Sequence, residues 1–326
     1  MNISIIIPNY NGEELLKKNL PKVIEAAEGY KEGDTEITIV DDDSTDGSVI
    51  YIKNKISNIR DTYKKSKINL KIFENPTNLG FSSIVNRGVE KAKGEIVVLL
   101  NTDVLPEEDF LKPLIEHFND KSVFAVGCMD KSIDLPAGKA GNGKTVLRGR
   151  GIGKWEKGFL VHRRGEVDKK NTLWVSGGSG AFRKSIWDKL SGFNEPYNPF
   201  YWEDIDLSYR ALKSGYKVLF EKRSVVYHKH SEGAIKTHYS EFQIKTIAYR
   251  NQFIFVWENA TDISLQFLHV FWLPYHFLKA LIRLDMPFFI GFLRALILLP
   301  KIIISSFKAQ KMFVKTDYEV IKEFIK

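Results

Sequence analysis

Polar residues follow three apolar runs in the first third of the chain, each at a place where a β-strand would end. The groups are Pro8-Asn-Tyr-Asn-Gly12, Asp41-Asp-Asp-Ser-Thr-Asp-Gly47 and Asn101-Thr-Asp103. A single Asp after a strand is often only the N-cap of the next helix, and Ser44 or Asp46 can have that role. Three consecutive carboxylates repel one another unless a cation or hydrogen-bond donors compensate. The pattern therefore predicts a polar ligand site.

A second acidic group, Trp202-Glu-Asp-Ile-Asp206, stands at the expected start of a helix. Acids in a first helical turn favour the helix dipole, but a carboxylate placed there can also be a general base that takes a proton from a hydroxyl group. Both can hold for Asp204. His228 lies after a short apolar run and is a candidate metal ligand, although a lone His is usually structural and His230 competes for the role. An imidazole ligand favours Mn²⁺ or Mg²⁺ over an all-oxygen Ca²⁺ site.

The elements that must position these residues follow from hydrophobic periodicity. Short β-branched runs alternate with amphipathic segments, which predicts a doubly wound, mostly parallel α/β sheet. Ligands bind such sheets at the carboxyl ends of the strands, where the three polar groups lie. The expected strands are 3–7, 36–40, 70–73, 96–100 and 123–126, and the expected helices are 13–28, 48–59, 82–93 and 107–119.

The middle of the chain changes character at residue 129. Residues 129 to about 172 are rich in Gly and Lys, and we expect a long, partly mobile insertion there. Within it, Gly138-Lys-Ala-Gly-Asn-Gly-Lys-Thr145 matches the P-loop pattern, but it lacks the buried strand before it and the helix after it that a P-loop needs. We interpret it as a flexible cationic loop. Beyond it we expect strands at 173–176, 217–220 and 224–227 and helices at 184–190 and 204–214.

The C-terminal part is aromatic and aliphatic, with single cations between apolar runs. A membrane-spanning helix needs about 20 predominantly apolar residues. Runs 267–278 and 288–304 are both interrupted, and we expect Pro287 and Pro300 to divide the segment into shorter helices. At 3.6 residues per turn, five cations fall within an arc of roughly 60°. This favours an amphipathic anchor on an anionic membrane surface, with a cap on the catalytic domain or a dimer interface as the alternative. The five cations are Lys279, Arg283, Arg294, Lys301 and Lys308.

Composition narrows the class of protein. The chain has 326 residues and a net charge of +8, which suits one large domain with an appendage, or two domains, and an anionic partner. The aromatic residues are densest in the apolar C-terminal part, which fits lipid better than nucleic acid, so no nucleic-acid partner is expected. Cys128, the only cysteine, excludes an intrachain disulfide and favours a reducing compartment. The N-terminus has no basic region of a signal peptide. We expect a cytoplasmic enzyme, peripheral on the inner face of the cell membrane.

The order and spacing of the motifs resemble glycosyltransferase family 2, which has the GT-A fold. The resemblance covers about residues 1–235, and residues 174–210 look most like the rhamnosyltransferase-like branch. It rests on Ser4-Ile-Ile-Ile-Pro-Asn-Tyr-Asn-Gly12, Val40-Asp-Asp-Asp-Ser-Thr-Asp-Gly-Ser48, Asn75-Pro-Thr-Asn-Leu-Gly-Phe81, Asn86-Arg-Gly88, Leu99-Leu-Asn-Thr-Asp103, Gly177-Gly-Ser-Gly-Ala-Phe182, Gly192-Phe-Asn-Glu195 and Trp202-Glu-Asp-Ile-Asp-Leu-Ser-Tyr-Arg210.

The resemblance implies a role for each matching residue. Asp103 and His228 would bind Mg²⁺ or Mn²⁺, and Asp204 would be the catalytic base, with Glu203 next in line. Asn101 departs from the family pattern, because an Asp often stands at that position, and the amide lowers the charge of the site. Gly178 and Trp202 would contact the acceptor. The donor would be bound by Pro8, Tyr10, Asn11, Asp41, Asp43, Gly80, Asn101, Thr102 and Asp103.

The implied activity is inverting transfer of a sugar from a dTDP- or UDP-sugar, with rhamnose as the first expectation, to a hydroxyl of a lipid-linked or cell-surface glycan. Transfer directly to a polyprenyl phosphate and a non-catalytic membrane-associated scaffold are the alternatives. We expect a GT-A domain over residues 1–240 and a helical, membrane-surface-associating region over 241–326. Within the domain, 1–128 would form the nucleotide-sugar-binding half and 129–240 the acceptor-binding half.

Overall fold

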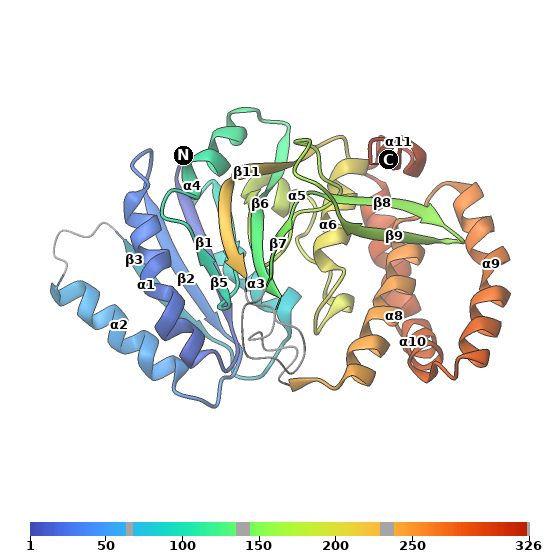
Figure 1. Ribbon diagram of the computed structural model, residues 1–326, viewed down its shortest axis with the longest axis horizontal. Coiled ribbons are helices and arrows are strands. Elements are labelled where there is room, and N and C mark those ends of the chain that lie inside the picture. The colour runs from blue at the N-terminus through green and yellow to red at the C-terminus, as the bar shows by residue number, and fades with distance from the viewer. Residues whose placement is uncertain (63–67, 135–143, 229–237, 325–326) are drawn as a thin grey trace.

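The computed structural model describes residues 1–62, 68–134, 144–228 and 238–324 of the chain (Figure 1). Its main sheet has the strand order β3-β2-β1-β4-β10-β6-β11-β5, with β7 paired to β6. The first four strands of this order run parallel, which confirms the expected α/β architecture. They are β1 (Ile3–Asn9), β2 (Thr35–Asp41), β3 (Asn69–Glu74) and β4 (Ile96–Leu100).

The other half of the sheet is mixed. Strand β10 (Ser179–Arg183) runs antiparallel between β4 and β6 (Val123–Asp134), and β11 (Lys217–His228) lies parallel to β6. Two short strands, β5 (Val104–Pro106) and β7 (Lys144–Arg148), pair antiparallel with β11 and β6. The sheet is therefore mixed but mostly parallel, as a GT-A-like fold requires.

Helices cover both faces of the sheet because successive strand residues enter two different hydrophobic clusters. Ile6 and Leu99 pack with α3 (Phe81–Lys91), whereas Ile5 and Leu100 pack with α1 (Glu13–Gly29). Burial on both faces explains why these strands read as continuous apolar runs. The remaining helices of the domain are α2 (Ser48–Thr62), α4 (Leu111–Ile115), α5 (Lys184–Lys189), α6 (Glu203–Lys213) and the 3₁₀ turns η1 (Glu116–Asn119) and η2 (Glu195–Tyr197).

The expectation of an irregular insertion after residue 129 is wrong for the described residues. Strand β6 continues to Asp134, β7 follows, and β8 (Gly151–Glu156) and β9 (Phe159–Arg164) form a separate two-stranded hairpin. Its glycines serve close packing, since a Cβ on Gly151 would lie 2.2 Å from the Trp174 ring. Most of the P-loop-like pattern lies outside the described residues.

Three other element predictions need correction. Residues 173–176 are not a strand; the strand of this region is β10, a few residues later. The helix expected over 107–119 is shorter, because β5 and a turn precede α4. The two strands expected over 217–227 are one strand, β11, with an irregularity between Glu221 and Val225.

Four C-terminal helices follow: α8 (Glu241–Asn259), α9 (Ile263–Ile282), α10 (Met286–Gln310) and α11 (Asp317–Ile321). Pro287 lies in the first turn of α10, where proline is tolerated, but Pro300 lies inside α10 and does not divide it. Ala295 and Ile302, on either side of Pro300, are buried in the core, and α10 packs along α8. This packing compensates for the one helical hydrogen bond that a proline removes.

Among the described residues, α10 is the one helix that is long and apolar enough to cross a membrane by length and composition. Its most apolar 18-residue window has a mean hydropathy of 2.0, and 22% of that window is buried within the protein. The expectation that neither C-terminal run reaches this criterion is therefore wrong for α10, because the helix continues through Pro300.

A pair of aspartates attaches the last helix to the rest of the protein. Asp317 accepts hydrogen bonds from the backbone N–H groups of Thr261 (2.7 Å) and Asp262 (2.9 Å), at the start of α9. Asp262 in turn accepts from the N–H groups of Asp317 (3.2 Å) and Tyr318 (3.0 Å). The ammonium group of Lys213, at the end of α6, lies 3.0 Å from Asp317, and both side chains are fully buried. We call this arrangement the reciprocal cap.

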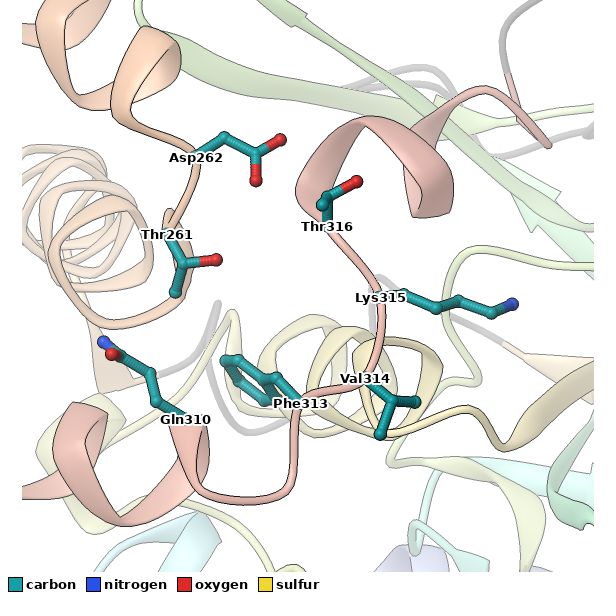
Figure 2. Close-up of a pocket in the computed structure, with 7 residues that line it drawn as sticks. All are labelled: Thr261, Asp262, Gln310, Phe313, Val314, Lys315 and Thr316. Atoms are coloured by element: carbon teal, nitrogen blue, oxygen red, sulfur yellow. The ribbon is translucent and has the colours of Figure 1, made fainter.

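A small cavity of about 400 Å³ adjoins the reciprocal cap (Figure 2). The figure shows Thr261 and Asp262 on one side and Thr316 on the other, with Gln310 and Phe313 below them. Its lining comes from the C-terminal helices and the segment that joins them, far along the chain from the strand-end motifs. The cavity therefore belongs to the C-terminal attachment.

A buried polar network joins α6 to α8. Glu258 accepts hydrogen bonds from Asn194 and Tyr197, and Asp206 forms an ion pair with Arg210 (2.7 Å). Burial raises the pKa of Glu258 to about 8, the nearby Asp206 carboxylate adds to the shift, and Arg210 opposes it. Glu258 is thus protonated in the folded protein at neutral pH.

This raised pKa predicts a pH-dependent stability. The contribution of Glu258 is fully present below its ordinary pKa and is lost as the pH rises toward 8. We expect the unfolding temperature to fall between about pH 5 and pH 8, and to fall less in Glu258→Gln, which cannot ionise. Thermal unfolding at several pH values measures this, with Glu90→Gln on the exposed side of α3 as the control. Parallel curves for wild type and Glu258→Gln would contradict the prediction.

Candidate active site

The first two polar groups meet because β1 and β2 are parallel neighbours that end together. The side-chain amide of Asn9 donates to Asp41 (2.6 Å) and to the hydroxyl oxygen of Ser44 (3.2 Å). The Ser44 hydroxyl and backbone N–H donate to the same carboxylate at 2.7 and 3.0 Å. Asp41 is 1% exposed. Its charge is compensated by hydrogen-bond donors. These donors, or a cation, were the two ways in which the run of three carboxylates could be stabilised.

Asp42, which sequence reasoning did not single out, holds the next loop. It accepts hydrogen bonds from the N–H groups of Leu79 (3.0 Å) and Gly80 (2.9 Å) and from the Asn75 amide (2.8 Å). Gly80 has φ +85°, and a Cβ there would lie 2.9 Å from Asn198. The backbone therefore requires a glycine at position 80. Donor binding by Gly80 stays a prediction. In the sequence, the only indication of a role for Asp42 was its position between Asp41 and Asp43 in the run of three carboxylates.

The other predicted residues of these loops range from buried to exposed. Pro8 is buried in β1, the Tyr10 ring lies 5.6 Å from that of His238, and the Asn11 side-chain oxygen accepts from the Thr45 N–H (2.8 Å). Asp43 is exposed, with φ +65°. Asp46 caps α2 through the Ser48 N–H (3.0 Å), as expected for a strand-end Asp.

The third polar group faces β11. One oxygen of Asp103 lies 3.0 Å from Nε2 of His228, and Nδ1 of the same ring lies 3.5 Å from Asp130. All three side chains are nearly buried. Burial lowers the pKa of His228, but the two carboxylates outweigh it and raise the pKa to about 9. His230 lies outside the described residues.

A carboxylate and an imidazole that face each other suit Mg²⁺ or Mn²⁺. No group of three His, Cys, Asp or Glu side chains with metal-site geometry occurs in the described parts of the chain. Asp103 and His228 would therefore be the protein's ligands, and substrate phosphates and water would complete the shell, as is usual for Mg²⁺. The residues present fit such an ion.

Asn101 and Gly178 connect the Asp103–His228 pair to the start of α6. The Asn101 N–H donates to the Gly178 carbonyl (3.0 Å), and a Cβ on Gly178 would lie 2.6 Å from the Asn101 amide nitrogen. The buried Oδ1 of Asn101 has no hydrogen-bond partner among the described residues. Thr102 fixes the loop from behind, since its carbonyl accepts from Asn19 (2.7 Å).

Asp204 lies at the start of α6, next to the same turn. Its carboxylate accepts from the N–H groups of Gly177 (3.3 Å) and Ile205 (2.8 Å). Burial raises the pKa of Asp204, and the charge of Arg164 opposes that rise. Burial and the Asp204 charge raise the pKa of Glu203 well above its usual range. Of these adjacent acids, Asp204 is thus the better candidate for an ionised base.

The loop before α6 is strained and held from behind. Tyr201 and Trp202 have φ +73° and +76°, a conformation that non-glycine residues rarely adopt. The Asn251 amide, on α8, donates to the carbonyls of Phe200 (2.9 Å) and Tyr201 (2.8 Å). The Trp202 indole is buried and packs against the ring of Phe255 on α8.

The β8–β9 hairpin supplies two residues that sequence reasoning missed. The His162 ring packs edge-on against Trp174 and Trp202, at centroid distances of 5.1 and 4.8 Å. Burial, together with the charge of Arg164, lowers the pKa of His162 to about 4, so the ring is neutral. Arg164 stacks on Trp174 at 5.3 Å. The signal was the alternation of buried and more exposed residues along β9, but the glycines of β8 and of the turn, Gly151, Gly153 and Gly158, made the segment look like a loop.

The opposite end of this hairpin rests on α9. The carbonyls of Lys157 and Gly158, at its turn, lie 2.8 Å from nitrogens of His276 and His269. The hairpin thus contacts α9 at its turn and, through His162, the residue before α6, Trp202.

The fold and the strand-end site together define a nucleotide-sugar-binding domain of the GT-A type. Residues 4–190 match the model of the family described as Glycosyl transferase family 2, and the chain belongs to that family. It is accordingly a nucleotide-sugar glycosyltransferase.

Curated relatives and solved structures agree with this assignment. The chain is 26% identical over 237 residues to an O-antigen chain rhamnosyltransferase of Salmonella typhimurium, covering 71% of this chain and 67% of that protein. It is 31% identical over 132 residues to a dolichol-phosphate mannosyltransferase of Pyrococcus furiosus, covering 39% of this chain and 33% of that one. The chain therefore spans about two thirds of the first relative and one third of the second.

Two solved structures share the fold. S. aureus TarS in complex with UDP-GlcNAc superimposes with a TM-score of 0.57 at 16% identity, over 99% of this chain and 91% of that one. A mannosyltransferase from Pyrobaculum calidifontis in complex with GDP-Man and Mn²⁺ gives 0.53 at 19% identity, over 78% and 62%.

Proposed function

We propose that this glycosyltransferase transfers a sugar, with inversion, from a nucleotide-diphosphate sugar to a hydroxyl of a lipid-linked or cell-surface glycan. The observation that carries the proposal is that two groups of side chains meet at one turn, Gly177–Gly178. Asp204 accepts a hydrogen bond from Gly177, and Asn101, two residues before Asp103 of the Asp103–His228 pair, donates one to Gly178. A diphosphate-binding centre and a base on neighbouring elements are the two parts that such a displacement needs.

Each group of site residues would have its own role in the transfer reaction. The Asp204 carboxylate removes the proton from the acceptor hydroxyl while that oxygen attacks the anomeric carbon and the bond to the nucleoside diphosphate breaks. The buried turn at Gly177 keeps the carboxylate in place. A Mg²⁺ or Mn²⁺ ion held by Asp103 and His228 would supply positive charge against the diphosphate. The loops at Pro8–Asn11, Asp41–Asp43 and Gly80 would surround the nucleoside.

The donor is proposed to be a dTDP- or UDP-sugar, with rhamnose first because of the Salmonella relative. Hydrolysis and thermal-shift screens of a nucleotide-sugar panel with Mn²⁺ and Mg²⁺ test this. We expect one donor to raise the unfolding temperature only with the metal. Stabilisation by no member of the panel would contradict the proposal.

The Pyrococcus relative favours a second candidate, transfer directly to a polyprenyl phosphate. Product analysis separates the two. Glycan extension with a lipid-linked acceptor supports the first proposal, and label appearing on polyprenyl phosphate alone supports the second.

We further propose that α9 and α10 bind an anionic membrane surface on the cytoplasmic side. Apolar residues that recur along α9 are exposed by more than half, including Phe267, Phe271 and Leu278. On α10, Arg294, Lys301 and Lys308 follow one another at intervals of seven residues, and all three are exposed. A large exposed apolar face next to cations is the pattern of an interfacial helix.

The membrane prediction is tested with surface variants that leave the core intact. Phe267→Ser, Phe271→Ser and Ile297→Ser, combined, should strongly reduce sedimentation with phosphatidylglycerol vesicles, because each removes apolar area from the bilayer contact. Ile50→Ser, at an exposed position of α2, is the control and should have no effect. Wild-type protein that ignores vesicles at low salt, or that resists carbonate washing as a spanning protein does, would contradict surface binding.

A further inference from the structure

The His228 imidazole lies between two carboxylates, one from the turn after β4 and one from strand β6. Asp103, of the strand-end motif, faces Nε2 at 3.0 Å, and Asp130, within β6, faces Nδ1 at 3.5 Å. A histidine that binds a metal through one ring nitrogen carries a proton on the other, and that N–H is almost always given to a carboxylate, a carbonyl or water. The two sides of this ring are therefore not equivalent.

We propose that Asp130 is the positioning residue of the metal centre, which accepts the Nδ1–H of His228 and thereby directs Nε2 toward the ion beside Asp103. The inference rests on the proposed metal-assisted function. Asp130 is not a ligand in this arrangement, because the imidazole ring separates it from the position next to Asp103.

The sheet fixes Asp130 in this role. Strands β6 and β11 are parallel neighbours, with Asp130 paired to Val226 and Ser132 paired to His228. The register places Asp130 diagonally across from His228, within reach of a side-chain contact. The Ser132 hydroxyl donates to the other oxygen of Asp130 at 2.7 Å, and Nε of Arg148 donates to Ser132 at 3.0 Å. Asp130 is only 4% exposed, so its orientation is set by these neighbours.

The sequence offered a partial signal for this residue. Asp130 follows the apolar run 123–128, as the three strand-end groups follow theirs, but it lies in the region expected to be irregular. Its partner is almost a hundred residues away, and the β6–β11 pairing is what brings the two together.

The test measures Mn²⁺ affinity in the presence of UDP, by calorimetry or by the EPR signal of free Mn²⁺. Asp130→Asn keeps the shape but weakens the acceptor for Nδ1–H, so we expect the Mn²⁺ Kd to rise by about 10- to 100-fold, the range for loss of such a partner. Metal-free UDP affinity and the unfolding temperature without metal should stay unchanged. Pulsed EPR at saturating Mn²⁺ should still show the imidazole nitrogen coupling, which His228→Ala abolishes.

Two further variants keep the result interpretable. Asp120→Asn alters an exposed carboxylate that pairs with Lys217 at the other end of β11, and it should leave the Mn²⁺ Kd unchanged. Ser132→Ala removes one support of Asp130 and should raise the Kd by a smaller factor; it replaces Asp130→Asn if that variant does not fold.

The outcomes separate the two proposals. Wild-type protein whose UDP affinity is the same with and without Mn²⁺, and which takes up no Mn²⁺ when UDP is bound, would contradict the metal-assisted function itself. Wild-type affinity for Mn²⁺ in Asp130→Asn, or an equal loss of metal-free UDP binding, would overturn only the role of Asp130.

Discussion

Asp204→Asn should lower the turnover number by about 10²-fold or more, the scale of general-base catalysis. The substitution preserves the shape of the side chain and one of its two hydrogen bonds, because the N–H groups of Gly177 (3.3 Å) and Ile205 (2.8 Å) donate to different oxygens and the amide nitrogen of Asn cannot accept. It removes the basicity. Because the base acts on the acceptor hydroxyl, the affinity for the donor should change little.

Steady-state kinetics with a fixed donor, together with calorimetric donor binding, measure both expectations. Glu203→Gln is the matched control, since Glu203 is the adjacent acid but is buried, with a pKa well above its usual range. A turnover of Asp204→Asn within a few-fold of wild type would show that another group takes the proton. A large loss in Glu203→Gln alone would identify that group.

Asp103→Ala should abolish metal-dependent donor binding, because it removes one of the two proposed metal ligands, Asp103 and His228, which lie 3.0 Å apart. The fold should survive, since the Asp103 side chain lies at a strand end and fills little of the core. Calorimetry with UDP and Mn²⁺ measures the loss, and circular dichroism verifies the fold. The control is Asp188→Ala, an exposed carboxylate of α5. Unchanged affinity in Asp103→Ala would remove this residue from the metal site.

The first half of the fold could be predicted from sequence because each strand is buried on both faces. Runs such as Ile3–Ile7 and Ile96–Leu100 then appear as uninterrupted apolar segments between amphipathic helices. The hairpin β8–β9 could not be predicted in this way. It has one side on the core, and its glycines, which let Trp174 and the neighbouring strand approach, look like loop residues.

The same contrast applies to the site. Four of the predicted site residues lie directly after a strand or at the start of a helix, so hydrophobic periodicity is enough to find them. They are Asp41, Asn101, Asp103 and Asp204. Asp130, His162 and Arg164 reach the site from strands, and their relevance depends on pairings between distant segments. The buried Asp41 also shows that a motif residue can be present for loop structure, and donor binding by Asp41 stays a prediction.

The reciprocal cap sets an order of assembly. The start of α9 and the buried ammonium group of Lys213 both depend on Asp317, which follows both apolar helices in the chain. A ribosome therefore delivers α9 and α10 before Asp317, so the contacts of the reciprocal cap form only after both helices have been synthesised. During that interval the start of α9 is not yet capped, and its exposed apolar residues, such as Phe267 and Phe271, face the surroundings of the nascent chain. A lipid surface or a chaperone can therefore bind them before the enzyme has closed.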